Sequence, residues 1–173
     1  KVRSDFGAPD ILINNAGITR DGVFRKMSLE DWMAVVDTNL NSLFIVTKQV
    51  IDGMLDKGWG RIVNISSING QKGQFGQTNY SAAKAGMHGF TMALAQEVAK
   101  KGVTVNTVSP GYIGTDMVMA VPEEVRNKII AGIPVGRLGQ PEEIAGLITY
   151  LSSDLAGFIT GANLAINGGQ HMM

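Results

Sequence analysis

The chain has 173 residues, of which 45% are hydrophobic, and its 15 lysines and arginines balance its 15 aspartates and glutamates. This composition supplies a core for one domain over residues 1–173 and argues against disorder, nucleic-acid binding and binding to anionic membranes. The absence of cysteine excludes disulfides, thiolate catalysis and cysteine metal sites.

No run approaches about 18 uninterrupted apolar residues, and residues 1–7 lack the apolar core of a secretory signal. We therefore expect a cytoplasmic protein with no membrane partner. The two histidines, His88 and His171, are far apart in the sequence. We expect surface or interface roles for them, and we predict no metal site.

Hydrophobic patterning predicts alternating strands and helices. Short apolar runs closed by turn residues predict strands, and apolar positions at helical spacing predict helices. The expected strands are residues 10–17, 60–67, 103–108 and 163–167. The expected helices are residues 28–55, 78–100, 122–131 and 141–152, with a glycine-rich loop at 68–77. This alternation is typical of an α/β fold with a parallel sheet.

Three strand ends carry residues suited to a binding site. Ligands of parallel α/β sheets bind at the carboxyl ends of the strands. That rule places Gly17, Ser67 and the turn Pro110-Gly111 along one edge of the sheet. We therefore expect these residues to converge on one site.

Tyr80 and Lys84 lie one turn apart near the start of an expected helix, so their side chains share one face. A fixed cation beside a phenol stabilises the phenolate and lowers the tyrosine pKa. Such a pair can give a proton to a carbonyl oxygen or take one from an alcohol. An isolated pair of this kind is more often a surface tyrosine beside a solvated lysine. The interpretation therefore depends on the motifs around the pair.

Five motifs occur in a recognisable order, namely Asn14-Asn-Ala-Gly17, Asn39, Ser67, Tyr80-Ser-Ala-Ala-Lys84 and Asn167-Gly-Gly169. Together they resemble the short-chain dehydrogenase/reductase family over essentially the whole chain. The resemblance implies a Rossmann-like, doubly wound parallel sheet. The chain would form the C-terminal two thirds of that domain, because the sequence contains no glycine-rich turn to receive a cofactor pyrophosphate.

The resemblance also implies a role for each matching residue. Tyr80 would protonate a substrate carbonyl, Ser67 would orient it, Lys84 would bind the nicotinamide ribose and lower the tyrosine pKa, and Asn39 would hold a water of a proton relay. The cofactor-binding residues would be Asn15, Ala16, Gly17, Tyr80, Lys84, Pro110, Gly111, Ile113 and Thr115. The substrate-binding residues would be Asp21, Gln74, Phe75, Gln77 and Tyr112.

Residues 18–21, 24–27 and 69–77 resemble the members of the family that reduce acetoacetyl-CoA for polyhydroxyalkanoate synthesis. The resemblance implies an NADPH-dependent homotetramer that reduces acetoacetyl-CoA, an acyl-CoA, to 3-hydroxybutyryl-CoA. The preference for NADPH over NADH rests on this resemblance alone. One alternative is reduction of 3-oxoacyl-acyl-carrier protein, although only one of the family's two basic carrier-protein positions, Gly58 and Lys101, is basic here. Another is a catalytically silent role in assembly, because the cofactor-binding N-terminal segment is absent.

Overall fold

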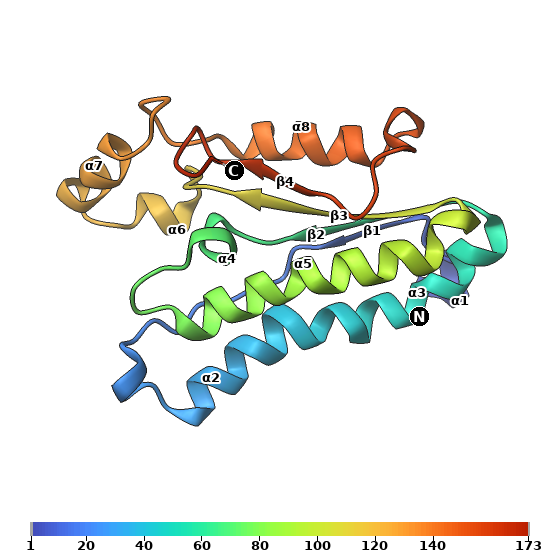
Figure 1. Ribbon diagram of the computed structural model, residues 1–173, viewed down its shortest axis with the longest axis horizontal. Coiled ribbons are helices and arrows are strands. Elements are labelled where there is room, and N and C mark those ends of the chain that lie inside the picture. The colour runs from blue at the N-terminus through green and yellow to red at the C-terminus, as the bar shows by residue number, and fades with distance from the viewer. Residues whose placement is uncertain (1, 173) are drawn as a thin grey trace.

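The computed structural model describes residues 2–172, and it shows one parallel sheet between layers of helices (Figure 1). In chain order the elements are α1 (Val2–Phe6), β1 (Ile11–Asn14), η1 (Phe24–Lys26), α2 (Leu29–Val36), η2 (Asp37–Asn41), α3 (Ser42–Lys57), β2 (Gly60–Ile65), α4 (Ile68–Lys72), α5 (Thr78–Val98), η3 (Ala99–Lys101), β3 (Val103–Pro110), α6 (Asp116–Met119), α7 (Glu123–Ala131), α8 (Pro141–Leu151), η4 (Asp154–Ala156) and β4 (Asn163–Ile166).

The sheet has four parallel strands in the order β1-β2-β3-β4. Helices α3 and α5 cover one face, and α8 covers the other (Figure 1). This arrangement confirms the predicted doubly wound α/β fold. Within residues 2–172, β1 is paired on one side only.

Neighbouring residues of β2 point into two separate cores. Ile62 packs with Met54 of α3 and Val105 of β3, on the side of α3 and α5. Val63 packs with Leu151 of α8 on the other side. Because both faces of β2 are covered, every residue of the strand is buried, as expected for a central parallel strand.

The predicted helix over 28–55 begins as expected, because the Ser28 hydroxyl accepts a hydrogen bond from the backbone N–H of Asp31 at 3.0 Å. It is not one regular helix, however. A π-helical turn, η2, separates α2 from α3. Such a widened turn changes the direction of the side chains it carries, and here it carries Asn39.

The prediction of a loop over 68–77 was partly wrong. Residues 68–72 form the short helix α4, which begins where the Ser67 hydroxyl accepts a hydrogen bond from the Asn69 N–H at 3.1 Å. The four-residue helix α6 also lacked a periodic apolar signal. Within residues 2–172 none of the helices combines the length and apolar character that a membrane span requires.

Candidate active site

A cavity of about 210 Å³ lies at the carboxyl ends of β2 and β3, where the expected site residues converge. Its walls come from the strand ends, from α4 and α5, and from the segment that follows β3. The polar residues among them include Ser67, Asn69, Gln77, Tyr80, Tyr112 and Thr115.

Tyr80 lies at the start of α5 and lines the cavity together with Ser67, whose hydroxyl can hydrogen-bond the phenol. Burial raises the pKa of Tyr80 above its ordinary value, the bond to Ser67 lowers it, and the charge of Asp21 raises it further. Lys84, which we expected to lower this pKa, is not among the causes of the shift. The Lys84 Nζ lies over the ring face, 5.5 Å from its centroid, and the loss of water around the phenol dominates.

Lys84 is itself buried, and its ammonium donates to the backbone carbonyl of Ile65 at 2.7 Å. Burial lowers the pKa of Lys84 to about 8. The side chain is therefore anchored to the end of β2 and remains mostly protonated at neutral pH.

Asn39 is fully buried, and its amide nitrogen donates to the carbonyls of Ile18 and Val35, each at 2.9 Å. Its Oδ1 has no hydrogen-bond partner among residues 2–172. A Cβ on Gly17 would lie 2.6 Å from this oxygen and 3.5 Å from the Lys84 Nζ. Asn39 and Lys84 thus flank Gly17. The packing of Asn39 leaves no room for a side chain at this position.

Asn69 was missed by sequence reasoning, although it lies two residues beyond Ser67. Its Nδ2 donates to the Gln77 Oε1 at 2.9 Å, and the Gln77 Nε2 donates to the Asp21 Oδ2 at 2.8 Å. This chain of hydrogen bonds fixes the Gln77 amide and brings the Asp21 charge close enough to affect Tyr80. Because residues 68–77 were expected to form a loop, where polar residues are common, Asn69 gave no separate signal.

The remaining predicted residues divide into two groups. Gln77 and Tyr112 line the cavity, whereas Gln74 and Phe75 lie outside its lining on an exposed loop. The Gln74 Oε1 instead accepts from the Lys72 Nζ at 3.2 Å, and the Phe75 side chain is 86% exposed. Asn15 and Ala16 are also exposed and lie outside the cavity lining.

The loop after β3 offers donors that suit a nicotinamide group. In residues 2–172, the backbone N–H of Ile113 and the hydroxyl of Thr115 have no hydrogen-bond partner, and both residues line the cavity. With Lys84 and Tyr80 they form a polar donor set of the kind that binds an amide and a ribose. Gly111, beside Pro110, packs too closely on β4 for a side chain, since its Cβ would lie 2.8 Å from the Asn167 Cα.

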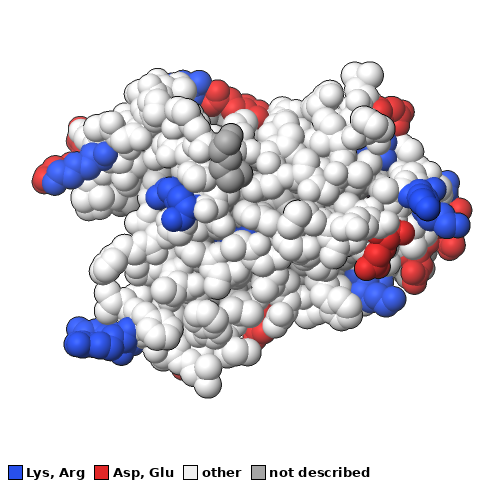
Figure 2. Space-filling model, viewed as in Figure 1, with Lys and Arg blue, Asp and Glu red and all other residues white. Residues whose placement is uncertain are grey.

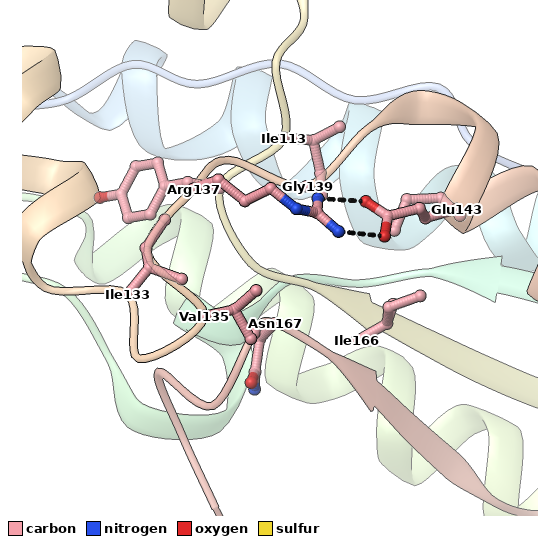
Figure 3. A pocket seen from close by; sticks show the side chains of 11 residues that line it. Ile113, Ile133, Val135, Arg137, Gly139, Glu143, Ile166 and Asn167 are labelled. Carbon is pink, nitrogen blue, oxygen red and sulfur yellow. Dashed lines mark hydrogen bonds and ion pairs between the residues drawn. The ribbon is translucent and has the colours of Figure 1, made fainter.

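A second, smaller cavity of about 130 Å³ lies behind this loop and shares Tyr112 and Ile113 with the first. Figure 3 shows its apolar side chains and the paired contact between Arg137 and Glu143, with both N–O distances at 2.8 Å. The hydrogen bonds from Arg137 lower the pKa of Glu143 to about 2. The ion pair fixes the segment before α8, and Gly139 of that segment bridges to Ile113.

Comparisons with known proteins agree with this geometry. A protein-family model described as enoyl-(acyl carrier protein) reductase matches residues 1–171. An acetoacetyl-CoA reductase of Cupriavidus necator is 73% identical over 99% of this chain and 70% of its own length. The acetoacetyl-CoA reductase of Allochromatium vinosum is 62% identical over the same shares. The 3-oxoacyl-[acyl-carrier-protein] reductase FabG of Pseudomonas aeruginosa is 51% identical over 99% of the chain and 69% of its own length.

These matches extend over nearly every residue, and the parallel sheet, the shared cavity of Tyr80 and Ser67 and the buried Lys84 agree with them. Among residues 2–172, no group of three or more His, Asp or Glu side chains is arranged to hold a metal ion. The chain belongs to the short-chain dehydrogenase/reductase family.

Proposed function

We propose that the protein reduces acetoacetyl-CoA to 3-hydroxybutyryl-CoA with NADPH. One observation carries the proposal: the Tyr80 phenol and the Ser67 hydroxyl line the same cavity, and Lys84 lies one turn further along α5. This geometry lets two hydroxyl groups meet one carbonyl oxygen.

In the proposed reaction, Ser67 and Tyr80 hydrogen-bond the ketone oxygen of the substrate. A nicotinamide cofactor, when bound, would supply the hydride for the carbonyl carbon, and the Tyr80 phenol would supply the proton to the oxygen. Burial raises the pKa of Tyr80, so the phenol is protonated at neutral pH and ready to donate. The developing alkoxide is a stronger base than a phenolate, so this proton transfer is favourable.

Lys84 and Asn39 are proposed to return the proton. The Lys84 ammonium lies over the Tyr80 ring, and the unpaired Oδ1 of Asn39 lies beside the same Gly17 position as the Lys84 Nζ. A water bound between an acceptor and an ammonium has the partners that it needs. Lys84, Tyr80, Ile113 and Thr115 are the proposed contacts for the nicotinamide riboside.

The choice of an acyl-CoA rests on the names of the more similar relatives and on surface charge. Figure 2 shows an outline hollowed between the projection that carries α7 and the one around η1, with lysines and arginines at both ends. Arg25 and Lys26 belong to η1, and Arg126 and Lys128 belong to α7. Such cations suit the phosphates of coenzyme A.

A thioester of an acyl-carrier protein is the alternative substrate, since FabG relatives match at lower identity. The comparison of the specificity constants for acetoacetyl-CoA and acetoacetyl-carrier protein distinguishes the two. We expect acetoacetyl-CoA to give the larger kcat/KM, and equal or larger values with the carrier protein would reassign the substrate. NADPH and NADH are compared in the same assay, with NADPH expected to give the larger value.

Tyr80→Phe tests the reaction itself. The variant keeps the ring and the helix but lacks the proton donor, so kcat should fall by about 10²–10⁴-fold while the circular-dichroism spectrum is unchanged. Tyr150→Phe on α8 is the matched control, because Tyr150 is exposed and lies outside the cavity. Near-normal turnover of Tyr80→Phe would remove Tyr80 as the proton donor. No NADPH oxidation by the wild-type protein would favour the catalytically silent alternative.

Gln74 and Phe75 are proposed to contact the short acyl chain when substrate is bound. Both lie on the loop between Asn69 and Gln77, two residues that line the cavity. Replacing either one by alanine should lower kcat/KM for acetoacetyl-CoA, with a loss of about 1–3 kcal/mol in transition-state stabilisation. Unchanged kcat/KM in both variants would remove these two residues from the substrate site.

A homotetramer is proposed from the face formed by α3 and α5. Phe44, Ile45 and Val46 of α3 are 65%, 58% and 41% exposed, and Met92 of α5 is 51% exposed. Adjacent exposed apolar side chains of this kind suit contact with a second copy. Light scattering coupled to size-exclusion chromatography tests the assembly, and a mass equal to one chain would contradict it.

A further inference from the structure

His88, for which the sequence predicted a surface or interface role, lies one turn beyond Lys84 on α5 and is half-buried. Its Nε2 lies 3.0 Å from the Ser66 hydroxyl and 3.5 Å from the Ser109 hydroxyl. These serines immediately precede Ser67 and Pro110 in the sequence. The histidine therefore contacts the two strand ends that lead into the candidate active site.

The surrounding hydrogen bonds determine which group donates to which. The Ser66 hydroxyl donates to the backbone carbonyl of Lys84 at 2.9 Å. A carbonyl only accepts, and a serine has one hydroxyl proton, so Ser66 has no proton left for His88. The Ser109 hydroxyl likewise donates to the Asn163 Oδ1 at 2.7 Å. The His88 Nε2 must therefore be the donor.

This proton count fixes the tautomer of the ring. Burial lowers the pKa of His88, so the imidazole is neutral at neutral pH. A neutral imidazole has one N–H, and the geometry assigns it to Nε2.

The hydrogen bonds around His88 join four elements next to the candidate active site. Ser66 follows β2, Ser109 lies in β3, Asn163 begins β4, and the Lys84 carbonyl belongs to α5. The same turn of α5 is tied a second time, since the Lys84 Nζ donates to the Ile65 carbonyl at 2.7 Å. Loss of the His88 donor would leave two buried hydroxyls without that partner and would loosen the connection between the strands and the helix.

We propose that His88 is a positioning residue for the proposed reduction: by donating from Nε2 to Ser66 and Ser109, it holds the ends of β2 and β3 in register with the turn that carries Lys84. Through these serines it sets the positions of Ser67 and of the Pro110-Gly111 turn. His88 touches neither substrate nor cofactor. The inference rests on the proposed function for its kinetic consequence, whereas the tautomer stands independently.

The kinetic test compares His88→Leu, which removes the donor, with His88→Gln, whose Nε2 still donates from a similar reach. His88→Leu should lower kcat by about 10–100-fold, because small displacements of catalytic groups have effects of this size, while KM for acetoacetyl-CoA changes little. His88→Gln should recover kcat to within about threefold of the wild type. Gln96→Leu is the control, since Gln96 is an exposed residue of α5 whose amide bonds only its own helix.

The spectroscopic test uses the wild-type protein with ¹⁵N-labelled histidine, whose two ring nitrogens have distinct shifts when one is protonated. We expect the Nε2–H tautomer for His88, identified by its loss in His88→Gln. An Nδ1–H tautomer, a wild-type kcat in His88→Leu, or equal losses of kcat in both His88 variants would overturn the proposal.

The two tests also separate this inference from the reaction proposed above. A wild-type protein that fails to reduce acetoacetyl-CoA but shows the Nε2–H signal would contradict the function and leave the network in place. If His88→Leu does not fold, the wild-type tautomer and the kcat of His88→Gln decide the question.

Discussion

Gly17 lies where a Cβ atom would come within 2.6 Å of the Asn39 Oδ1. Asn39 cannot turn away, because its Nδ2 is bound to the Ile18 and Val35 carbonyls. Gly17→Ala should therefore displace Asn39 and the neighbouring Lys84 Nζ, with a loss of about 1–3 kcal/mol in the free energy of unfolding. The kcat for acetoacetyl-CoA should fall as well. Chemical denaturation and steady-state kinetics measure the two effects.

Gly22→Ala is the matched control in the same connecting segment. No atom lies within 4 Å of a Cβ built on Gly22, and alanine retains the N–H that donates to the Gly76 carbonyl at 2.8 Å. Its stability and kcat should stay near the wild-type values. Equal effects of the two substitutions would show that the contact with Asn39 is not the cause.

The charge of Asp21 should influence the pH dependence of the reaction. This charge raises the pKa of Tyr80, after the larger contribution of burial. Asp21→Asn removes the charge but keeps an acceptor for the Gln77 amide, so the pKa of Tyr80 should fall. Reduction requires the protonated phenol, and its rate is lost as pH rises through that pKa. The alkaline fall of kcat/KM should therefore move to lower pH.

Oxidation of 3-hydroxybutyryl-CoA gives an independent check of the direction in which the pKa of Tyr80 shifts. This direction requires the phenolate, so its rate should begin to rise at lower pH in Asp21→Asn than in the wild type. Asp52→Asn, on the exposed side of α3, serves as the control. A shift to higher pH, or the same shift in the control, would contradict an effect of Asp21 on Tyr80.

Periodicity predicted the four strands and the long helices because each buries a regular apolar face, as Ile62 and Val63 do on opposite sides of β2. It did not predict η2. A π-helical turn is defined by its backbone hydrogen bonds, and a single such turn of five residues inside a long helix changes the apolar spacing too little to be recognised.

The order of the motifs predicted that Ser67, Tyr80 and Lys84 lie close together, but it could not predict the pKa shifts of Tyr80 and Lys84. The pKa of Tyr80 depends on how much water burial removes and on a contact between Gln77 and Asp21, which are far apart in sequence. The sequence predicted only a surface or interface role for His88, because its partners come from two strands and their proximity exists only in the folded sheet.

The packing of α4 on α5 should be as sensitive to an added methyl group as the packing around Gly17. A Cβ on Gly70 would lie 2.8 Å from the Lys84 carbonyl carbon and 3.0 Å from the Ala85 nitrogen, and neither backbone atom can rotate away. Gly70→Ala should push α4 from α5 and cost about 1–3 kcal/mol of stability, with a fall in kcat because α4 begins at Ser67.

Gly89→Ala provides a control of opposite sign. Gly89 lies in α5 with nothing within 4 Å of a built Cβ, so alanine should raise stability by about 0.5–1 kcal/mol through its higher helix propensity. Thermal unfolding of both variants measures the difference. A stabilised Gly70→Ala would show that α4 does not pack on Lys84 as described.

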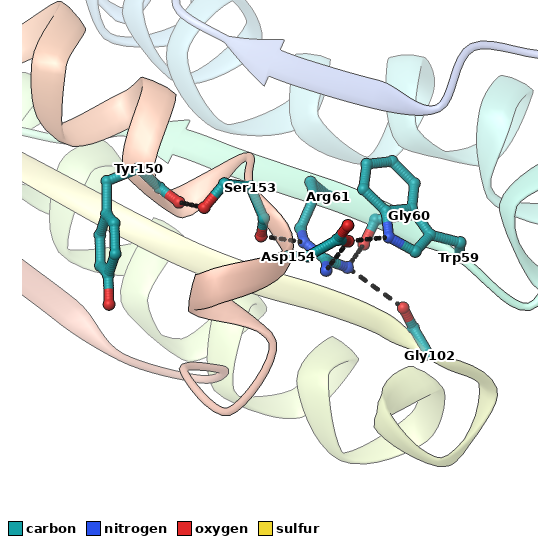
Figure 4. Close-up of polar contacts among 7 residues, drawn as sticks. All are labelled: Trp59, Gly60, Arg61, Gly102, Tyr150, Ser153 and Asp154. Carbon is teal, nitrogen blue, oxygen red and sulfur yellow. Dashed lines mark hydrogen bonds and ion pairs between the residues drawn. The ribbon is translucent and has the colours of Figure 1, made fainter.

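At the amino ends of the strands, Arg61 forms a separate polar cluster (Figure 4). Its side chain is 4% exposed and lies 4.4 Å from the centroid of the Trp59 ring. Its guanidinium donates to the carbonyls of Gly60 at 2.9 Å, Ser153 at 3.2 Å and Gly102 at 3.3 Å. The cluster therefore joins β2 to the segment after α8 and to the turn before β3.

Arg61→Leu should destabilise the protein by about 2–4 kcal/mol, because several buried carbonyls lose their donor at once. Asp154→Asn should cost less than about 1 kcal/mol. The Asp154 side chain is 87% exposed, its contact with Arg61 is 3.6 Å long, and asparagine can still accept from the Trp59 Nε1. Denaturant titrations of both variants test this ranking. Equal losses of stability would mean that the ion pair, and not the carbonyl contacts, makes Arg61 important. We expect kcat to be unaffected by either change, because the cluster lies at the opposite ends of the strands from Tyr80.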